Sequence, residues 1–558
     1  MISKLFNQES KTIAGAALLI GASAILSRAL GLIRDRLLVG RFGAGDELDA
    51  YFAAFQIPNL LFALLVVGTL SVAFIPVFTG YLAQKRQEEA WHVANAVLTV
   101  ALAVMGVICL VLIVAAPALV RVIAPGFEGE KFALTVKLTR IMMLSPLLFS
   151  VSAALSSVLN SYRRFAAVSM APLLYNAAII FGIVALSKPF GMAGVAWGAI
   201  LGAALHALVQ IPVARSLGWR FRPTFDVKSE GVREIGRLFL PRVFGVDVSQ
   251  FSQLLGAVIG TTLAAGSVSL FSLAINIAAV PLGTFAIPFA IAAFPTLSDA
   301  AARGDRATFR DVFATTFRQI LFFLIPLSAM AFILRVHVVR VVIGSSGLSW
   351  NETRLAAASL GLFVLALAFQ GLAPLLARSF YALKNTLVPV LISFVALAAN
   401  LISVFAFKAF LATGPGASTA WIWLGLFGVD DVRVLSVAAA FSIASFVQVV
   451  LLLFVLRRKF GRIGGTGIFR AFGKFFLGSA AAAWAAAAVI RPGLQHLDTR
   501  PFASVLGEAA LATVAGLGAY GLVLWLLKSE ELTSIVDAIR GRFLKIAKPM
   551  AVSDTQDL

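Results

Sequence analysis

The sequence predicts an all-α polytopic membrane protein with about 14 transmembrane helices. Of its 558 residues, 60% are hydrophobic and 13% are charged, and the mean hydropathy is +0.95. Soluble domains average about 45–50% apolar and about 25% charged residues, so this chain lacks the polar surface that a soluble fold needs. The apolar runs are also much longer than the alternating strands of membrane barrels, which leaves the helical class.

Fourteen segments are apolar enough, and long enough at about 20 residues, to cross a bilayer as helices. They are residues 13–39, 50–79, 92–120, 133–160, 166–187, 191–214, 234–264, 269–297, 309–342, 356–380, 386–411, 434–456, 469–490 and 503–528. The first of them contains arginines and is too long for a signal peptide. The polar residues 529–558 are expected to form a cytoplasmic tail.

The net charge of +20 is concentrated in short loops between the apolar segments. In a soluble protein such a charge would suggest nucleic acid, but here its placement indicates membrane topology, so no nucleic-acid partner is predicted. Alternate loops, beginning after the second span, carry the excess: Lys85, Arg86, Arg163, Arg164, Arg215, Arg220, Arg222, Lys228, Arg233, Arg303, Arg306, Lys384, Arg457, Arg458, Lys459 and Arg462. The positive-inside rule places these loops and both termini in the cytoplasm.

Two local similarities indicate an internal repeat. The segment around Pro76 resembles that around Pro295, and the segment around Tyr162 resembles that around Tyr381; each pair is 219 residues apart. Six spans per copy predict two parallel repeats, an arrangement used by alternating-access transporters. The predicted organisation is an N-lobe (residues 1–230), a C-lobe (231–460), two further helices outside the repeat (461–528) and a tail (529–558).

The first span contains Arg28, Arg34 and Asp35. A charged side chain at the centre of a bilayer costs about 2.5–3.5 kcal/mol, so it is expected to face a partner or a polar cavity and to mark a functional site. Arg28 and Asp35 are seven residues apart and therefore lie on nearly the same helix face. Buried guanidinium groups favour carboxylate or phosphate partners, which indicates an anionic substrate.

Other spans add polar residues that belong to the same candidate site. Asn59 follows Pro58 in the second span, Arg242 and Asp247 lie in the seventh, and Asn276 lies in the eighth. The repeat predicts that these helices meet at a midline between the lobes. For asparagine the alternative is a structural bond between helices. Asp247, like Asp35, is a candidate for ion coupling, because it could neutralise an arginine or take up a proton.

No motif indicates catalysis, a metal or a cofactor. The glycine-rich stretch ending at Lys474 lacks the spacing of a phosphate-binding P-loop, so the chain is not expected to hydrolyse ATP by itself. The four histidines are scattered, and the single cysteine, Cys109, lies in an apolar run. The prediction is a transporter rather than an enzyme.

Several segments resemble the MurJ/MviN lipid II flippases, a family of the multidrug/oligosaccharidyl-lipid/polysaccharide exporter superfamily. They are SRALGLIRD (27–35), RFGAG (41–45) with Asp49 and Ala50, PNLL (58–61), APGF (124–127), LNSYRRF (159–165), APLLYN (171–176), VSQ (248–250) and AGSVS (265–269). They occur in order from about residue 12 to at least 400.

The resemblance implies two six-helix lobes that form a V around a cationic cavity, with a groove for a lipid tail formed by the two helices of residues 461–528. It also implies that lipid II, an undecaprenyl-diphosphate-linked peptidoglycan precursor, binds there and leaves on the outer side as the lobes rock. The positions of Arg28, Arg34 and Asp49 are functionally important in the family, which makes these three residues candidates for substrate binding. Membrane lipids and cell-wall synthesis proteins are the expected partners. A diphosphate pairs well with guanidinium groups.

The chain departs from the family pattern in its second and eighth spans. The family's usual charged positions hold Phe62, Ala63 and Val67 in the second span, and Ile275, Asn276 and Ala279 in the eighth. One hypothesis is that Arg242 supplies the lost positive charge and Asp247 the lost acid. The alternatives are a flippase for another lipid-linked oligosaccharide and a transport-inactive scaffold in cell-wall assembly. The energy source stays open between the membrane potential and an ion coupled through Asp35, Asp49 or Asp247.

Overall fold

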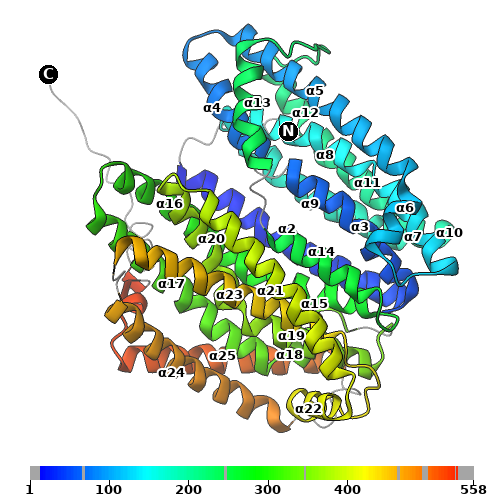
Figure 1. Ribbon diagram of the computed structural model, residues 1–558, viewed down its shortest axis with the longest axis vertical. Helices are drawn as coiled ribbons and strands as arrows, with labels where there is room; N and C mark the ends of the chain where they lie inside the picture. The colour runs from blue at the N-terminus through cyan, green and yellow to red at the C-terminus, as the bar shows by residue number, and fades with distance from the viewer. Residues whose placement is uncertain are drawn as a thin grey trace, which may run out of the picture. The chain divides into compact units, whose positions relative to one another are not determined.

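The computed structural model describes residues 13–65, 69–243, 248–344, 347–461, 465–492, 501–534 and 536–537. All regular structure in these ranges is helical, as the sequence predicts (Figure 1). A helix satisfies its own backbone donors and acceptors, which is the condition for placing a backbone in lipid.

Most elements are α-helices, and two short segments, η1 and η2, are π-helical. In chain order they are α2 (Ile13–Phe42), α3 (Asp46–Leu65), α4 (Thr69–Ala83), α5 (Gln87–Val114), α6 (Ala116–Ile123), α7 (Gly129–Met142), α8 (Ser145–Ser161), α9 (Phe165–Phe181), η1 (Gly182–Leu186), α10 (Ser187–Phe190), α11 (Met192–Leu208), α12 (Ile211–Ser216), α13 (Glu230–Val243), α14 (Val248–Gly260), α15 (Ser267–Pro281), η2 (Leu282–Ala286), α16 (Ile287–Ala302), α17 (Arg306–Ile333), α18 (Arg335–Val342), α19 (Trp350–Leu365), α20 (Leu367–Ala382), α21 (Leu387–Leu411), α22 (Gly414–Leu424), α23 (Leu435–Phe460), α24 (Gly465–Ile490) and α25 (Phe502–Leu526).

Ten helical stretches of the described chain are long and apolar enough to cross a membrane, and a bent pair, α19 and α20, makes up to eleven. The other three predicted spans correspond to α2, to α3 with α4, and to α13 with α14. The helix α2 contains several charged residues, and residues outside the described ranges interrupt the other two. The polytopic helical architecture is therefore confirmed, and the predicted fourteen spans are consistent with it.

The chain forms two compact units. Unit 1 comprises residues 1–280, 339–363 and 393–444, and unit 2 comprises residues 281–338, 364–392 and 445–558. In unit 1 a buried cluster, which includes Phe74, Phe78, Leu155 and Leu159, joins α4 to α8. These apolar contacts fix the helices on which the candidate site is built.

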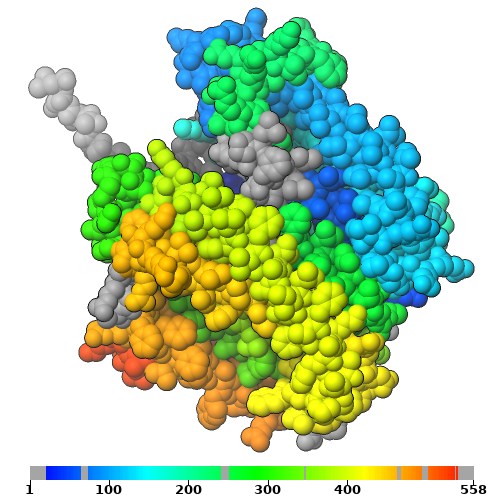
Figure 2. Space-filling model, in the orientation of Figure 1, coloured from blue at the N-terminus to red at the C-terminus, as the bar shows by residue number. Residues whose placement is uncertain are grey.

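In unit 2 the helices α24 and α25 pack on one another and on α17, where Tyr520 donates a hydrogen bond of 2.7 Å to the carbonyl oxygen of Phe322. Both helices also present large apolar side chains outward, including Phe469, Trp484 and Trp525, which are 77%, 76% and 68% exposed. The end of the chain, orange to red in Figures 1 and 2, thus has the surface of a lipid-facing helix pair.

The 219-residue offset recurs in the helix boundaries. The helices α5 and α17 each have 28 residues and begin 219 residues apart, and the eight-residue helices α6 and α18 that follow them are separated by the same offset. The turn before each long helix also matches, because Lys85 and Gly304, again 219 residues apart, both have a positive φ (59° and 71°). Gly304 adopts this conformation freely, whereas Lys85 pays a steric cost for it.

Candidate functional site: the polar networks of unit 1

Arg34 and Asp35 of α2 contact two other helices of unit 1. Arg34 donates to its neighbour Asp35 through Nε (3.0 Å) and NH2 (2.7 Å), and to the side-chain oxygen of Asn176 on α9 through NH1 (3.2 Å). Asn276 on α15 donates to the other carboxylate oxygen of Asp35 (3.2 Å). Arg34, Asp35, Asn176 and Asn276 are called the Arg34 network below.

The acid of this network is buried. The Asp35 side chain is 3% exposed and that of Arg34 is 22% exposed. A buried carboxylate is stable only if it is paired and hydrogen-bonded, and here both of its oxygens accept bonds. The Arg34 side chain is more exposed than that of Asp35, so the pair combines a buried acid with a cation that is only partly enclosed.

Arg28 lies on the same face of α2, as its spacing from Asp35 predicts. Its NH1 donates to the backbone carbonyl of Val280 at 2.8 Å. Since Asn276 and Val280 are four residues apart on α15, Arg28 and Asp35 bind successive turns of one antiparallel helix. The face of α2 that the sequence singles out is therefore the face that contacts α15 and α9.

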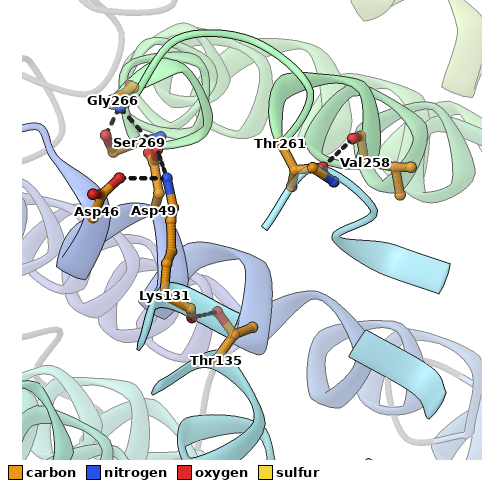
Figure 3. A network of polar contacts seen from close by, with 9 residues as sticks. Asp46, Asp49, Lys131, Thr135, Val258, Thr261, Gly266 and Ser269 are labelled. Carbon is orange, nitrogen blue, oxygen red and sulfur yellow. Dashed lines mark hydrogen bonds and ion pairs between the residues drawn. The ribbon is translucent and has the colours of Figure 1, made fainter. Parts of the chain in front are cut away.

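Asp49 makes a different kind of contact (Figure 3). Its carboxylate is 1% exposed, receives hydrogen bonds of 2.8 Å from the backbone N–H groups of Gly266 and Ser269, and forms an ion pair of 3.0 Å with Lys131. Lys131 also contacts Asp46 at 2.8 Å. These five residues are called the Asp49 cluster. It joins the first turn of α3 to α7 and to the first turn of α15.

The backbone donors that Asp49 binds are those that the first turn of a helix leaves without an internal partner. A carboxylate at this end also interacts favourably with the helix dipole, a contribution of about 0.3–1 kcal/mol at exposed sites and more when partly buried. Asp49 thus supplies from a distant helix the cap that α15 does not provide itself. Its carboxylate is fully engaged in these contacts.

A second close approach occurs at neighbouring loops. The backbone N–H of Gly126 points to Thr261 Oγ1 at 3.4 Å, and a side chain on Gly126 would collide with the Thr261 backbone. Thr261 Oγ1 in turn donates to Val258 at the end of α14 (2.6 Å), as Figure 3 shows. Only glycine allows the APGF segment to lie this close, which explains the residue at this position.

The remaining predicted site residues stand apart from these networks. Asn59 is exposed on α3 and is a member of neither network. The side chain of Arg242 and all of Asp247 lie outside the described part of the chain, so their assignment stays a prediction. Among the residues that the structure describes, no three histidine, cysteine or acidic side chains come close enough to hold a metal ion.

The sequence analysis did not predict two residues that bind the candidate site residues: Asn176, which binds Arg34, and Lys131, which binds Asp49. Asn176 also donates to Ser27 (3.2 Å to Oγ) and to the carbonyl of Pro172 (3.1 Å), so it fixes α9 against the start of the charged segment of α2. Asn176 is the last residue of the APLLYN segment, which is part of the family resemblance but had no predicted function. Lys131 follows the APGF segment, and its charge beside an apolar span was a usable signal.

Comparison with known proteins agrees with this architecture. The family model described as lipid II flippase MurJ matches residues 38–507. The chain is 29% identical over 399 residues to a probable lipid II flippase MurJ of Bdellovibrio bacteriovorus, covering 70% of this chain and 76% of that protein. It is 27% identical to the lipid II flippase MurJ of Burkholderia cenocepacia, covering 68% and 75%.

Solved structures share the fold. One described as lipid II flippase MurJ in an inward closed conformation gives a TM-score of 0.71 at 23% identity and covers 91% of this chain and 99% of its own. An inward-facing multidrug resistance MATE family transporter of the MOP superfamily gives 0.62 at 15% identity, covering 78% and 94%. The helical fold is thus shared with membrane transporters. Because the family model spans most of the sequence, this chain belongs to the MurJ family of lipid II flippases.

Proposed function

We propose that the chain flips lipid II, a polyprenyl-diphosphate-linked peptidoglycan precursor, from the inner to the outer leaflet of the bacterial cytoplasmic membrane by alternating access. Family membership supports the substrate class. The Arg34 network is the observation that points to particular residues, because it places a partly exposed arginine side chain beside a buried acid in the first predicted span.

The diphosphate is proposed to bind Arg34 by exchange with Asp35. The Nε–NH2 edge that now faces Asp35 is the edge that binds two oxygens of a phosphate in a bidentate manner. A diphosphate that takes this edge would displace the carboxylate of Asp35. The resting pair then holds the cation in place without a substrate and avoids an isolated buried charge.

The same exchange would reach α15. Asp35 accepts a bond from Asn276 as well as from Arg34, so its movement changes the contact between α2 and α15. Arg28 is proposed as a second phosphate ligand, because a charged phosphate oxygen is a stronger acceptor than the neutral carbonyl of Val280 that it now binds. Head-group binding is thereby linked to helix packing.

The Asp49 cluster is proposed to hold the outer ends of α3, α7 and α15 together until release. The loop charges predict that these ends face outward, with both termini in the cytoplasm. A head group leaving on that side requires the contacts of Asp49 with Lys131, Gly266 and Ser269 to separate. In this proposal Asp49 acts on the conformational step, and Arg28 and Arg34 act on the substrate.

Complementation tests the proposal. A bacterium depleted of its own lipid II flippase is given the wild-type chain, Arg34→Gln or Arg34→Lys, with membrane levels measured for each. Rescue by the wild type, failure of Arg34→Gln and partial rescue by Arg34→Lys are expected, because lysine keeps the charge and loses the bidentate geometry. Exposed Arg121→Gln is the matched control and should rescue.

Failure of the wild-type chain at a normal membrane level would overturn the assignment to lipid II. It would favour another lipid-linked oligosaccharide or a scaffold role in cell-wall assembly. A fully active Arg34→Gln variant would leave the flippase role standing and remove Arg34 from the site.

A further inference from the structure

A second cationic site lies on unit 1 and is lined by residues that belong to neither polar network. A hollow of about 340 Å³ is lined by Arg36, Leu37, Gly40, Arg41, Ile183, Val184 and Lys188, and is called the α2–η1 hollow. Three of its lining residues are cations and none is acidic. These three positive charges repel one another unless an anion binds between them. The repulsion is stronger where the dielectric constant is low.

Arg36 forms the fixed side of the hollow. Its NH1 donates to the carbonyl oxygens of Arg340 (3.3 Å) and Val341 (2.7 Å), which belong to the last turn of α18. A guanidinium at a helix C-terminus satisfies carbonyls that lack an internal partner. Arg36 is therefore held in position by the protein itself, and the part of α2 that borders the hollow is anchored with it.

Arg41 and Lys188 form the open side. Both are exposed, and neither makes a hydrogen bond or ion pair within the described ranges of the chain. They come from separate elements, the last turn of α2 and the short helix α10, and meet at the rim of one hollow. Two cations that the fold brings together, and that no described part of the chain pairs, are available to an external anion.

The π-helical segment η1 is the second wall. Gly182 packs so closely on Gly198 of α11 that a side chain at either position would collide with the other backbone. Ser187 bonds to the carbonyl of Ile183 at 2.5 Å, which closes the end of the segment. π-Helical turns are rare and occur frequently at functional sites. This one turns Ile183 and Val184 toward the hollow.

The surroundings specify an amphipathic ligand. Next to the cations lie apolar groups exposed on the same elements: Val184 is 53% exposed, Phe181 49% and Phe190 60%. A cation beside exposed aromatic and aliphatic side chains matches the boundary between lipid head groups and acyl chains. A small soluble anion has no apolar part that could contact these side chains.

The predicted membrane topology does not account for the cations of the α2–η1 hollow. Arg41 and Lys188 lie by loops of the set that the positive-inside rule predicts to be outer and poor in basic residues. Topology therefore does not explain these charges. We propose that the α2–η1 hollow binds the phosphate head group of an anionic phospholipid, with Arg41 and Lys188 on the phosphate and Leu37, Ile183 and Val184 along the acyl chain.

Lipid binding by the full-length protein tests the site. The protein is purified and titrated with phosphatidylglycerol or phosphatidylcholine, and bound lipid is counted by native mass spectrometry. The double variant R41Q/K188Q should bind phosphatidylglycerol about 30-fold more weakly than the wild type, from the contribution of two cations near a lipid surface. The control R121Q/K137Q removes the same charge from exposed positions and should bind like the wild type.

Equal phosphatidylglycerol binding by R41Q/K188Q and the wild type would overturn the proposal, and so would an equal loss in the control. Inorganic phosphate that competes at the concentration of the lipid would show an anion site without lipid specificity and would also overturn it. The measurement does not depend on transport, so its result is separate from that of complementation.

Discussion

Asn276 and Asp35 are 241 residues apart in the sequence and are joined by a hydrogen bond of 3.2 Å between Nδ2 and Oδ2. The bond links α15 to the carboxylate that also holds Arg34. Any event that moves Asp35 therefore acts on α15. The charged segment of α2 is therefore both a candidate substrate contact and a connection between α2 and α15.

Asp35→Asn is expected to separate substrate binding from transport. The amide cannot neutralise Arg34, so the guanidinium should bind a diphosphate as well as before or more tightly. The exchange that returns Arg34 to Asp35 is lost, and transport should fall about 10-fold or more, the cost of removing one charge-assisted bond. Binding of a polyprenyl diphosphate and the flipping rate in proteoliposomes are the two readouts. Normal transport would refute the exchange.

Asn276→Ala is expected to destabilise the protein by about 1–3 kcal/mol, because it leaves one buried oxygen of Asp35 without its donor. Asn59→Ala is the matched control. Asn59 is exposed, so its loss should change stability by less than about 0.5 kcal/mol. Thermal unfolding in detergent measures both. If Asn59→Ala keeps its stability but loses substrate binding, the predicted role of Asn59 as a substrate ligand is confirmed.

The charged face of α2 was predictable because it is local. Helix periodicity places Arg28 and Asp35 on one side, and the structure brings both to α15. The identity of the partners was not predictable, since Asn176 is 142 residues from Arg34 and amide side chains are common between helices without any special role.

Asp49 shows the limit more clearly. The resemblance indicates a substrate ligand at Asp49, which stays a prediction. Its partners in the structure, two backbone N–H groups and Lys131, were not predicted. A cap supplied by a remote helix leaves no periodic pattern, because any residue offers the same N–H group. The helical class and the repeat offset, by contrast, follow from composition and from local similarity over long segments.

The pair of Asp49 and Lys131 is expected to be energetically coupled. Single variants Asp49→Asn and Lys131→Met each leave a charge in a mostly buried place, while the double variant removes both. A double-mutant cycle of unfolding free energies should give a coupling of about 0.5–3 kcal/mol. Additive effects would show that the ion pair contributes nothing. The pair Arg303 and Asp299, both exposed, is the control and should couple by less than 1 kcal/mol.

Gly266→Ala is expected to weaken the capped end of α15. Gly266 has φ of +86°, and an added methyl group would collide with the carbonyl oxygen of Ala44. Both effects oppose alanine, so the yield of folded protein and the melting temperature should fall. Gly45→Ala, one residue from Ala44 and with open space around its Cα, should be tolerated. Equal behaviour of the two variants would contradict this account of the contact.

Arg242→Ala tests the relocated charge. If Arg242 replaces the positive charge that the family usually carries in other spans, its loss should abolish transport while the protein still reaches the membrane. A fully active Arg242→Ala variant would end that hypothesis. Arg237→Ala on the same helix, α13, is the control for a general effect of charge.

Direct binding of a polyprenyl diphosphate to the purified protein tests the central claim, that Arg34 holds the diphosphate in exchange for Asp35. The account predicts that Arg34→Gln weakens binding about 10- to 100-fold, the contribution of a charge-assisted bond, while Arg121→Gln binds like the wild type. Equal affinities for the wild type and Arg34→Gln, both correctly folded, would contradict it.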